Sequence, residues 1–555
     1  MGKINRLLLF SCLFCLLGFN VQGQDRYAVF FKFKPQNGLS LASPQDFLTE
    51  KALQRRSREN VAPDSLDLPV SSKYLDAVKE NSDYILYASK WMNAAILVTD
   101  ESRKAELEAL PFVDRVELVA RGFTPKPDAR LKYLVRASVT LETCKEPKLN
   151  TREVAVESNS YDFQNQLIGI DKMHQEGFTG KGVAVAVFDA GFPGVKTATP
   201  FAHLFSNNRI IGQKDIVRPW NQEVFIDSQH GTNVLSLIAA NEPTQLVSGA
   251  YESDYILVIT EEVATEYRIE EFNWVRGAEY ADSLGVDIIN SSVGYWDFDD
   301  PSMNYSLADL DGKTTVITRG ASIAADKGIL VVNSVGNYGT RGTSSLVAPA
   351  DAEGILAIGS VTNTNEVSGF SSRGPTADGR IKPDLAAFGQ APILVRSNGV
   401  VGAGQGTSFS APQIAALAAG LWQAKPEWTK DELIQNLIRS ATQSEEPDNN
   451  LGYGIPNFLD AYYGEILSTP EDELIEFKVY PNPLATEVLS IDFGVSTSAV
   501  LDLVDLTGRR ILNQTISRRN AQEPYQVDLQ NLKHGMYVIR LTEGSLFRQI
   551  KLLKQ

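Results

Sequence analysis

The sequence predicts a central α/β domain whose mostly parallel β-sheet is covered by helices on both faces. Between residues 160 and 465, short runs of almost only apolar residues alternate with helical runs, a pattern typical of parallel strands buried on both sides. Residues 24–125 follow roughly the order strand, helix, two strands, helix, strand, which is the ferredoxin-like α+β pattern. Residues 470–555 contain short strands separated by turn residues, which predicts a small all-β sandwich.

The composition indicates a globular protein of several domains. The chain of 555 residues is too long for one domain, and three or four are expected. Hydrophobic residues make up 43% and charged residues 22% of the chain, which is ordinary for globular domains. The formal net charge of −16 argues against a general nucleic-acid binder, because such proteins present a basic face.

Residues 1–23 are interpreted as a secretory signal peptide. Lys3 and Arg6 precede an apolar run over 7–19, and Val21-Gln22-Gly23 is a plausible cleavage site. The apolar run is short for a membrane span, and no later stretch approaches ~18 apolar residues, so we expect no transmembrane span in the mature protein. After cleavage only Cys144 remains of the three cysteines, so no internal disulfide is expected.

The N-terminal unit, residues 24–125, contains no residue that suggests catalysis. Its helices are predicted at 43–60, with Ser43 as the cap, and at 101–110. Its strands are predicted at 26–34, as one or two strands within 83–100, and at 113–119. Taken alone, the unit is also compatible with an independent binding module. Residues 126–159 are polar and contain prolines, and we interpret them as a linker that holds a processing site.

The central domain, residues 160–465, is expected to place its functional residues at one edge of its sheet, because ligands of such sheets bind at the carboxyl ends of the strands. Its apolar strands are predicted at 182–191, 255–260, 286–294, 329–337 and 355–361. Its helices are predicted at 230–241, 273–285 and 322–328, with another starting near Phe409.

Asp189 and His230 are the first two candidate site residues. Asp189 ends an apolar strand, and Gly191 beside it lets the backbone turn away. His230 stands directly before a buried helix, and it alone of the four histidines has a glycine neighbour in that setting. Taken singly, such an aspartate is more often a turn or cap residue, and a lone histidine is more often a packed or surface residue.

Asn337 and Ser408 are the other two candidates. Asn337 follows the strand that begins at 329, where its amide can either donate to a substrate oxyanion or form an ordinary turn. Ser408 lies in a glycine-led turn, residues 406–412, before an apolar helix of small residues. It would sit beside unpaired N–H groups at the positive end of that helix. The alternative is that Ser408 or a neighbour simply caps the helix.

The order of these four residues is more specific than any one of them. Each follows a strand or begins a helix, and the order Asp, His, Ser is that of subtilisin. The motifs FDAG, HGTNV, SVGN and GTSFSAP surround them, and FSSRGP, IKPDLAAFG and GYGIP follow at family-like places. On these motifs, residues 160–465 resemble a subtilisin-like serine peptidase of the subtilase family. The resemblance implies the subtilisin-like three-layer sandwich.

The resemblance also implies a role for each residue. Ser408 would attack the scissile carbonyl, His230 would take its proton, and Asp189 would orient the imidazole. The Asn337 amide and the Ser408 N–H would form the oxyanion hole. The expected function is therefore a secreted serine endopeptidase that hydrolyses proteins through an acyl-enzyme intermediate. The segment expected to pair with the substrate backbone, and to leave room for the side chain before the cut, is Ser292, Val293 and Gly294.

The flanking units resemble domains that accompany such enzymes. The α+β unit is similar to the propeptides of subtilisin-like enzymes, which implies that it assists folding and inhibits the cleft until it is removed. Residues 470–555, with YPNP at 480–483, DLTGR at 505–509 and HGMYVIRL at 534–541, resemble a type IX secretion system sorting domain. That likeness implies a Gram-negative bacterium, export across both membranes by the type IX machinery, and a secreted or cell-surface location. The alternative is a carbohydrate- or protein-binding sandwich, but the sequence shows no aromatic platform.

No cofactor is expected for the chemistry. Asp309-x-Asp311-Gly312 resembles the start of a calcium loop but lacks the later ligands, so structural calcium is left open without an identifiable ligand set. One rival function is a catalytically silent surface or adhesion protein on a subtilase scaffold, although intact candidate residues argue against it. Another is an esterase or lipase, which usually carries G-x-S-x-G and the order Ser, Asp, His, neither of which fits.

Overall fold

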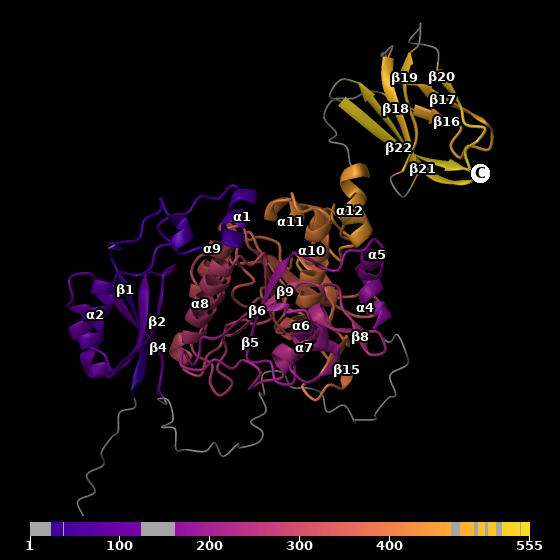
Figure 1. The fold of residues 1–555 in the computed structure, drawn as a ribbon. Helices are drawn as coiled ribbons and strands as arrows, with labels where there is room; N and C mark the ends of the chain where they lie inside the picture. Colours follow the sequence, from indigo (N-terminus) through magenta and orange to yellow (C-terminus); the bar gives the residue numbers. More distant parts are fainter. Residues whose placement is uncertain are drawn as a thin grey trace, which may run out of the picture. The chain divides into compact units, whose positions relative to one another are not determined.

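The computed structural model describes residues 24–36, 38–123, 161–467, 478–492, 498–505, 509–517, 524–543 and 546–555. The predicted signal peptide, 1–23, and the predicted linker, 126–159, lie outside these ranges. The chain divides into two compact units, one that ends at Phe458 and one that begins at Leu459 (Figure 1). Within the described ranges, none of the helices combines the length and the apolar character that a membrane crossing requires.

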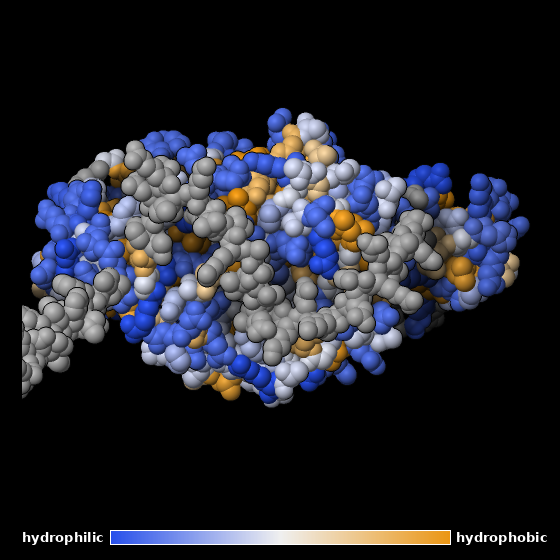
Figure 2. Space-filling view, turned by 90° about the horizontal axis from the view of Figure 1, so that it is seen from below, coloured by the Kyte–Doolittle hydropathy of each residue, from blue (hydrophilic) through white to orange (hydrophobic). Residues whose placement is uncertain are grey.

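The face of the molecule seen in Figure 2 is mostly hydrophilic where its residues are described. In Figure 2 the described residues form a largely blue face on which apolar residues occur in small, scattered groups. Single apolar residues on a surface are normal, because there is not enough polar surface to cover a folded chain.

The N-terminal part of the first unit has the predicted ferredoxin-like topology. Its four strands form an antiparallel sheet in the order β2-β3-β1-β4. Helices α2 (Ser72–Glu80) and α3 (Lys104–Glu108) cover one face of that sheet. The strands are β1 (Asp25–Phe31), β2 (Tyr84–Ser89), β3 (Ala94–Thr99) and β4 (Val113–Ala120).

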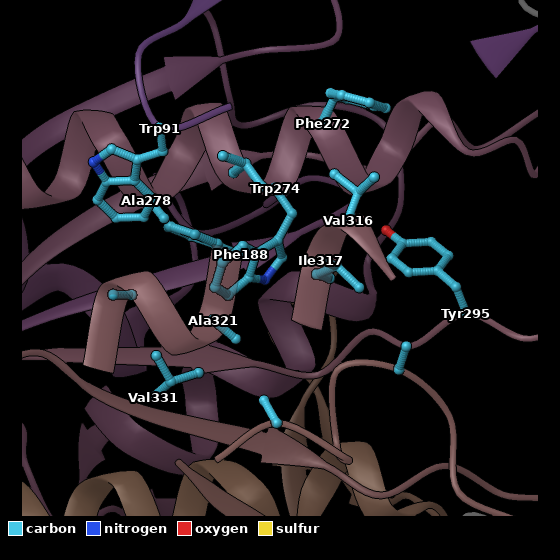
Figure 3. Close-up of a cluster of buried hydrophobic side chains, with 14 of the residues drawn as sticks. Trp91, Phe188, Phe272, Trp274, Ala278, Tyr295, Val316, Ile317, Ala321 and Val331 are labelled. Carbon is cyan, nitrogen blue, oxygen red and sulfur yellow. The ribbon is translucent and has the colours of Figure 1, made fainter. Parts of the chain in front are cut away.

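Side-chain alternation along β1 determines what covers each face of this sheet. Tyr27 and Val29 pack with α2 and α3, whereas Ala28 and Phe30 belong to a larger core shared with α8 (Ile269–Leu284) and α9 (Val316–Asp326) of the central domain. Successive side chains of a strand point to opposite faces. The sheet is therefore buried between its own helices and those of the central domain. Figure 3 shows part of the shared core, including Trp91 of the N-terminal part and Trp274 of α8.

The helix predicted over 43–60 is wrong at its N-terminal end. A short 3-10 turn, η1 (Pro44–Asp46), follows Ser43, and α1 runs only over Glu50–Arg58. Thr49 caps α1, because its hydroxyl accepts a hydrogen bond from the Ala52 N–H at 3.3 Å. The helix that covers the sheet is α2, which the sequence analysis missed. Both helices have nine residues, but they are buried in different ways. Helix α1 buries Ala52 and two arginines, whereas α2 packs Tyr74, Leu75 and Val78 against the sheet.

Helix α1 instead docks on the central domain through buried ion pairs. Arg55 Nη2 donates to Asp282 Oδ1 at 2.5 Å, and Arg56 Nη2 donates to the same oxygen at 2.9 Å. Asp67 accepts from Arg56 at 2.9 Å and from Lys327 Nζ at 3.0 Å. All five side chains are at most 3% exposed. Buried charges persist only when they are paired, so these pairs fix α1 at the end of α8.

The central sheet has seven strands in the order β13-β12-β11-β10-β5-β9-β6, and every neighbouring pair is parallel. The parallel sheet predicted from the apolar runs is thus confirmed. Strand β5 lies inside the sheet, with β9 and β10 on its two sides. The strands are β5 (Ala184–Asp189), β6 (Ile210–Asp215), β9 (Asp254–Ile259), β10 (Ile288–Ser291), β11 (Leu330–Ser334), β12 (Leu356–Val361) and β13 (Leu385–Phe388).

Alternation also assigns the helices to the two faces of the central sheet. Ala186 and Phe188 of β5 lie in the core with α8 and α9, so Val185 and Val187 point to the opposite face. There α7 (His230–Ala239) and α10 (Ala411–Ala424) pack on β5 and on each other. The expected three-layer arrangement is therefore present.

The remaining elements of the first unit are short. The helices are α4 (Asp162–Leu167), α5 (Ile170–Gln175), α6 (Ala202–Ser206) and α11 (Lys430–Arg439), and α12 (Phe458–Leu467) spans the division between the units. Two hairpins pair β7 (Asn241–Glu242) with β8 (Leu246–Val247) and β14 (Ile393–Val395) with β15 (Val401–Ala403). The 3-10 turns are η2 (Glu101–Arg103), η3 (Thr199–Phe201), η4 (Pro301–Met303), η5 (Leu307–Asp309), η6 (Gly339–Arg341) and η7 (Thr407–Phe409).

The second unit contains the predicted β-sandwich. One sheet has the order β16-β17-β20 and the other β19-β18-β21-β22, and their inner faces form a separate apolar core that includes Leu489, Leu501 and Ile539. Strand β19, over Arg510–Ser517, was not predicted, because only one of its eight residues is buried. The other strands are β16 (Lys478–Tyr480), β17 (Val488–Asp492), β18 (Ser498–Asp505), β20 (Tyr525–Asp528), β21 (Gly535–Glu543) and β22 (Leu546–Lys554).

The buried ion pairs of α1 lead to a stability prediction. Arg56→Ala leaves Asp67 and Asp282 short of a buried partner, so we expect the free energy that protects the α1 amides from hydrogen exchange to fall by about 3–5 kcal/mol. Gln54→Ala, on the exposed side of the same helix, is the matched control, with an expected change within about 0.5 kcal/mol. Equal effects of the two substitutions would contradict the docking role of the ion pairs.

Candidate active site

Three neighbouring strands bring the predicted site residues to one edge of the central sheet. In the parallel register, Phe188 of β5 lies opposite Ser291 of β10 and Val258 of β9. Asp189 is the last residue of β5, and it pairs with Ile259 at the end of β9. Strands β9 and β10 therefore end on either side of Asp189. Open parallel sheets bind their ligands at these carboxyl ends of the strands.

Asp189 and His230 form a direct pair. His230 is the first residue of α7, and its Nδ1 lies 2.8 Å from Asp189 Oδ2 and 3.0 Å from Oδ1. Asp189 is 1% exposed. A Cβ on Gly231 would lie 2.3 Å from the Gly191 carbonyl oxygen and 2.9 Å from Asp189 Cβ. Only glycine at position 231 therefore lets the start of α7 approach the end of β5 this closely.

The electrostatics of the pair favour a charged imidazole. Burial by itself lowers the pKa of His230, but the Asp189 carboxylate raises it through its charge and its hydrogen bond, and Glu261 adds to this effect. The net result is a His230 pKa above the ordinary value. The arrangement holds Nδ1 as the protonated nitrogen facing Asp189 and leaves Nε2 able to accept a proton.

Ser408 lies in η7, immediately before α10, and this short turn packs against α7. Its hydroxyl donates to the Ser292 carbonyl at 3.3 Å, and the Ser292 hydroxyl donates to the Ser408 carbonyl at 2.9 Å. The ring of Phe409 lies 5.7 Å from the His230 ring, centroid to centroid. Among the described residues, Ser292 is the hydrogen-bond partner of the Ser408 hydroxyl, and no hydrogen bond joins His230 to Ser408. Such bonds are often long without substrate.

Asn337 is held through the oxygen of its side chain, and among the described residues its NH₂ group has no hydrogen-bond partner. The Oδ1 atom accepts hydrogen bonds from Thr407 N–H at 3.0 Å and from the Thr407 hydroxyl at 3.1 Å. A Cβ on Gly406, whose φ is +146°, would lie 3.7 Å from Asn337 Nδ2 and 3.8 Å from Ser408 N. The glycine thus keeps open a space that faces two N–H donors. A space of this kind suits a small oxyanion.

Ser292, Val293 and Gly294 follow directly after β10. The Val293 carbonyl accepts a hydrogen bond from Asn333 Nδ2 at 3.2 Å. A Cβ on Gly294 would lie 2.2 Å from the Val347 side chain, so the glycine is also required for packing inside the protein. The structure brings this segment next to Ser408. Its use in substrate binding is a proposal.

The other residues singled out from the sequence have structural surroundings. His174 Nε2 and His203 Nε2 each lie 3.0 Å from a backbone carbonyl. Asp309 accepts from Ser306, and Asp311 accepts from the N–H groups of Lys313 and Thr314. Both aspartates of the calcium-like motif therefore serve their own turns. Among the described residues, no group of three or more His, Cys, Asp or Glu side chains is arranged to hold a metal ion.

The sequence analysis missed the carboxylates that lie beside the Asp189–His230 pair. Five glutamates occur between residues 261 and 271, and Glu261 interacts electrostatically with both Asp189 and His230. The sequence signal for these carboxylates is the high density of acidic residues directly after an apolar strand. An acidic run is usually a solvated surface, so this density does not by itself indicate a site.

Family models match three parts of the chain. Residues 180–454 match the subtilase family, and residues 26–132 match the peptidase S8 propeptide domain of Bacteroidota. Residues 478–555 match a secretion system C-terminal sorting domain. These matches account for the central domain, the ferredoxin-like part and the β-sandwich.

Curated relatives are similar over the same region. The chain is 26% identical over 374 residues to subtilisin E from Bacillus subtilis (strain 168), which covers 67% of this chain and 81% of that protein. It is 28% identical over 272 residues to subtilisin from Bacillus pumilus, covering 49% of this chain and 87% of that protein. Among solved structures, MycP1 from Mycobacterium smegmatis aligns with 57% of this chain and 89% of its own, at 22% identity and a TM-score of 0.44.

The pairing of His230 with Asp189 leads to a prediction for its titration. Asp189→Asn removes the charge that raises the His230 pKa and leaves its burial, so we expect the pKa of His230 to fall below the ordinary value. The measurement is an NMR titration of protein labelled at the histidine rings, which is tractable because the chain has four histidines. His174 and His203, whose pKa values burial lowers, are internal controls and should not move. An unchanged His230 pKa would contradict the pairing.

Proposed function

We propose that this chain, which belongs to the subtilase family, hydrolyses peptide bonds of proteins with Ser408 as nucleophile, His230 as general base and Asp189 as the residue that orients the imidazole. That it is a serine-type peptidase follows from its family match and its subtilisin relatives. The observation that carries the proposed residue roles is the 2.8 Å pair between the buried Asp189 and the half-buried His230, beside a serine at the start of a helix.

The proposed reaction has two halves. The Ser408 oxygen forms a bond to the scissile carbonyl carbon while its proton passes to His230 Nε2, and the carbonyl electrons move onto the oxygen. The resulting oxyanion would be stabilised by Asn337 Nδ2 and the Ser408 N–H, which both face the space beside Gly406. The carbon–nitrogen bond then breaks, and His230 returns the proton to the leaving amine. A water molecule attacks the acyl-enzyme by the same route and releases the acid.

The geometry supports the orienting role of Asp189 through specific contacts. Asp189 accepts from the Ala190 N–H at 2.7 Å as well as from His230, so its carboxylate is held in a fixed orientation. The Ser408 hydroxyl would have to turn from the Ser292 carbonyl to His230 Nε2 before it reacts. All proton transfers in this scheme use groups of the chain itself, so we propose that the chemistry requires no cofactor.

The flanking domains place the enzyme in its biological setting. The match of residues 26–132 to a peptidase propeptide indicates a precursor, and the match of residues 478–555 to a sorting domain of the type IX system indicates export to the cell surface or medium. We infer that the propeptide inhibits the peptidase until it is removed. Extracellular proteins are the substrates that this location offers.

The assignment of Ser408 as nucleophile has a sharp test. Ser408→Ala should abolish labelling of the mature protein by a fluorophosphonate and cleavage of a denatured protein. Ser410→Ala is the matched control, because Ser410 lies two residues away with its hydroxyl bonded to the Ala387 carbonyl at 3.0 Å, and it should keep both activities. Equal labelling of Ser408→Ala and the parent would refute the nucleophile.

The proposed oxyanion role of Asn337 predicts a defect in rate. Asn337→Ala should lower kcat by about 10²–10³, the scale known for such a donor in the relative subtilisin, with little change in KM. Single-turnover and steady-state hydrolysis of a peptide substrate would measure this. A loss confined to KM would instead show that Asn337 acts in ground-state binding.

A further inference from the structure

A group of carboxylates lies next to the Asp189–His230 pair. It extends from the end of β9 to the first turn of α8. The Thr260 N–H, one residue before the group begins, donates to the Asp189 carbonyl at 3.1 Å. We define the acidic cluster as Glu261, Glu262, Glu266 and Glu270.

The acidic cluster is joined to the segment proposed to bind substrate. Tyr295 directly follows Gly294, and its hydroxyl donates to Glu261 Oε2 at 2.5 Å. Strands β9 and β10 lie on either side of β5, so this hydrogen bond connects the two chain segments that flank Asp189. A polypeptide paired with residues 292–294 would therefore have side chains N-terminal to the cut beside the acidic cluster.

The acidic cluster lacks cations of its own. Glu270 is 1% exposed, and its Oε1 has no hydrogen-bond partner among the described residues. Burial, together with the charges of Glu261 and Glu266, raises the pKa of Glu270 well above its ordinary value. Burial, with the charges of Glu261 and Asp299, raises the pKa of Glu266 to about 8. Glu270 and Glu261 share a hydrogen bond, so the raised pKa keeps a proton on Glu270 and relieves the repulsion between the two carboxyl groups. A cation that approaches the cluster favours the ionised forms of these groups.

In this structure the propeptide supplies a cation. The Arg26 guanidinium in β1 donates to Glu262 Oε1, and the two side chains are 8% and 15% exposed. Arg26 pairs with Ala120 at the end of β4, so the propeptide sheet ends beside the acidic cluster. When the propeptide leaves, Arg26 leaves with it, and Glu262 loses this partner.

We propose that the acidic cluster binds a basic side chain of the substrate, so that the mature peptidase prefers Lys or Arg on the N-terminal side of the bond it cleaves. This proposal rests on the proposed function. In the precursor, Arg26 takes the place of that side chain. A guanidinium or ammonium group supplies several N–H donors and the positive charge that the four carboxylates lack. A metal ion is disfavoured, because no described group of acidic residues is arranged to hold one.

The chain itself contains sequence of the kind that this site would take. The stretch 126–136, which begins three residues after Phe123, the last described residue of the propeptide, has four basic residues and the single acidic residue Asp128. These basic residues are Lys126, Arg130, Lys132 and Arg136.

The test compares peptide-library cleavage by the mature peptidase, matured from the full chain, in its wild-type, Glu262→Gln/Glu266→Gln and Glu353→Gln forms. Glu353 is an exposed glutamate outside the acidic cluster and serves as the matched control. Wild type and control should cleave a peptide with Lys or Arg at one N-terminal-side position about tenfold or more faster, in kcat/KM, than its neutral analogue. The double variant should lose most of that ratio yet cleave the neutral peptide normally, which also shows that it is folded.

A charge reversal gives a second readout. Glu266→Lys should move the preference at the same position toward Asp or Glu. If wild type cleaves basic and neutral peptides equally, or if the variants keep the basic preference, the proposal is overturned while the peptidase function stands. If wild type cleaves no peptide, both fail. If calcium ions raise the melting temperature of wild type but not of the double variant, the cluster is a cation site and the proposal is also overturned.

Discussion

The requirement to bury a parallel sheet on both faces is the constraint on which the candidate site depends. All seven central strands run in the same direction, so their carboxyl ends meet at one edge. Asp189, Ser292 and Asn337 reach that edge from three strands that are distant in sequence. The two helices that cover one face, α7 and α10, begin at the same edge, and they add His230 and the turn that holds Ser408. The packing of α7 and α10 that covers the sheet therefore also assembles the site.

Two buried carboxyl groups near this edge of the sheet, those of Asp189 and Glu270, have different electrostatic surroundings. The buried Asp189 carboxylate has a partner, the His230 imidazole, and raises its pKa. The neighbouring Glu270 carboxylate, equally buried, has one oxygen without a partner, and its own pKa is raised instead. Glu270 has other carboxyl groups as its neighbours and shares a hydrogen bond with Glu261, whereas Asp189 faces an imidazole that can carry a positive charge. The Asp189–His230 pair suits proton transfer, and the carboxyl groups around Glu270 suit the proposed binding of a basic side chain.

The propeptide uses both faces of one small sheet and one additional helix. Alternate residues of β1 serve its own helices and the central domain, so the propeptide sheet forms an outer layer over α8 and α9. Helix α1 adds a charged anchor on Asp282 at the end of α8, and Arg26 reaches Glu262 near the beginning of the same helix. Propeptide arginines thus bind the last turn of α8 and the segment that leads into this helix, which links docking of the propeptide to the acidic cluster beside the site.

The sequence by itself determined the class of each domain and the four candidate residues. Apolar strands, glycine-led turns and the order of Asp189, His230, Asn337 and Ser408 are local patterns, and local patterns are legible without coordinates. It did not determine that α2 covers the propeptide sheet and that α1 does not, because a short helix can be buried through ion pairs, as α1 is, as well as through apolar residues. Only the tertiary structure decided that, as it decided that Glu261 and Glu270 stand beside the Asp189–His230 pair. Burial and the interaction between charges depend on distances in space, and these distances cannot be read from the separation of residues along the chain.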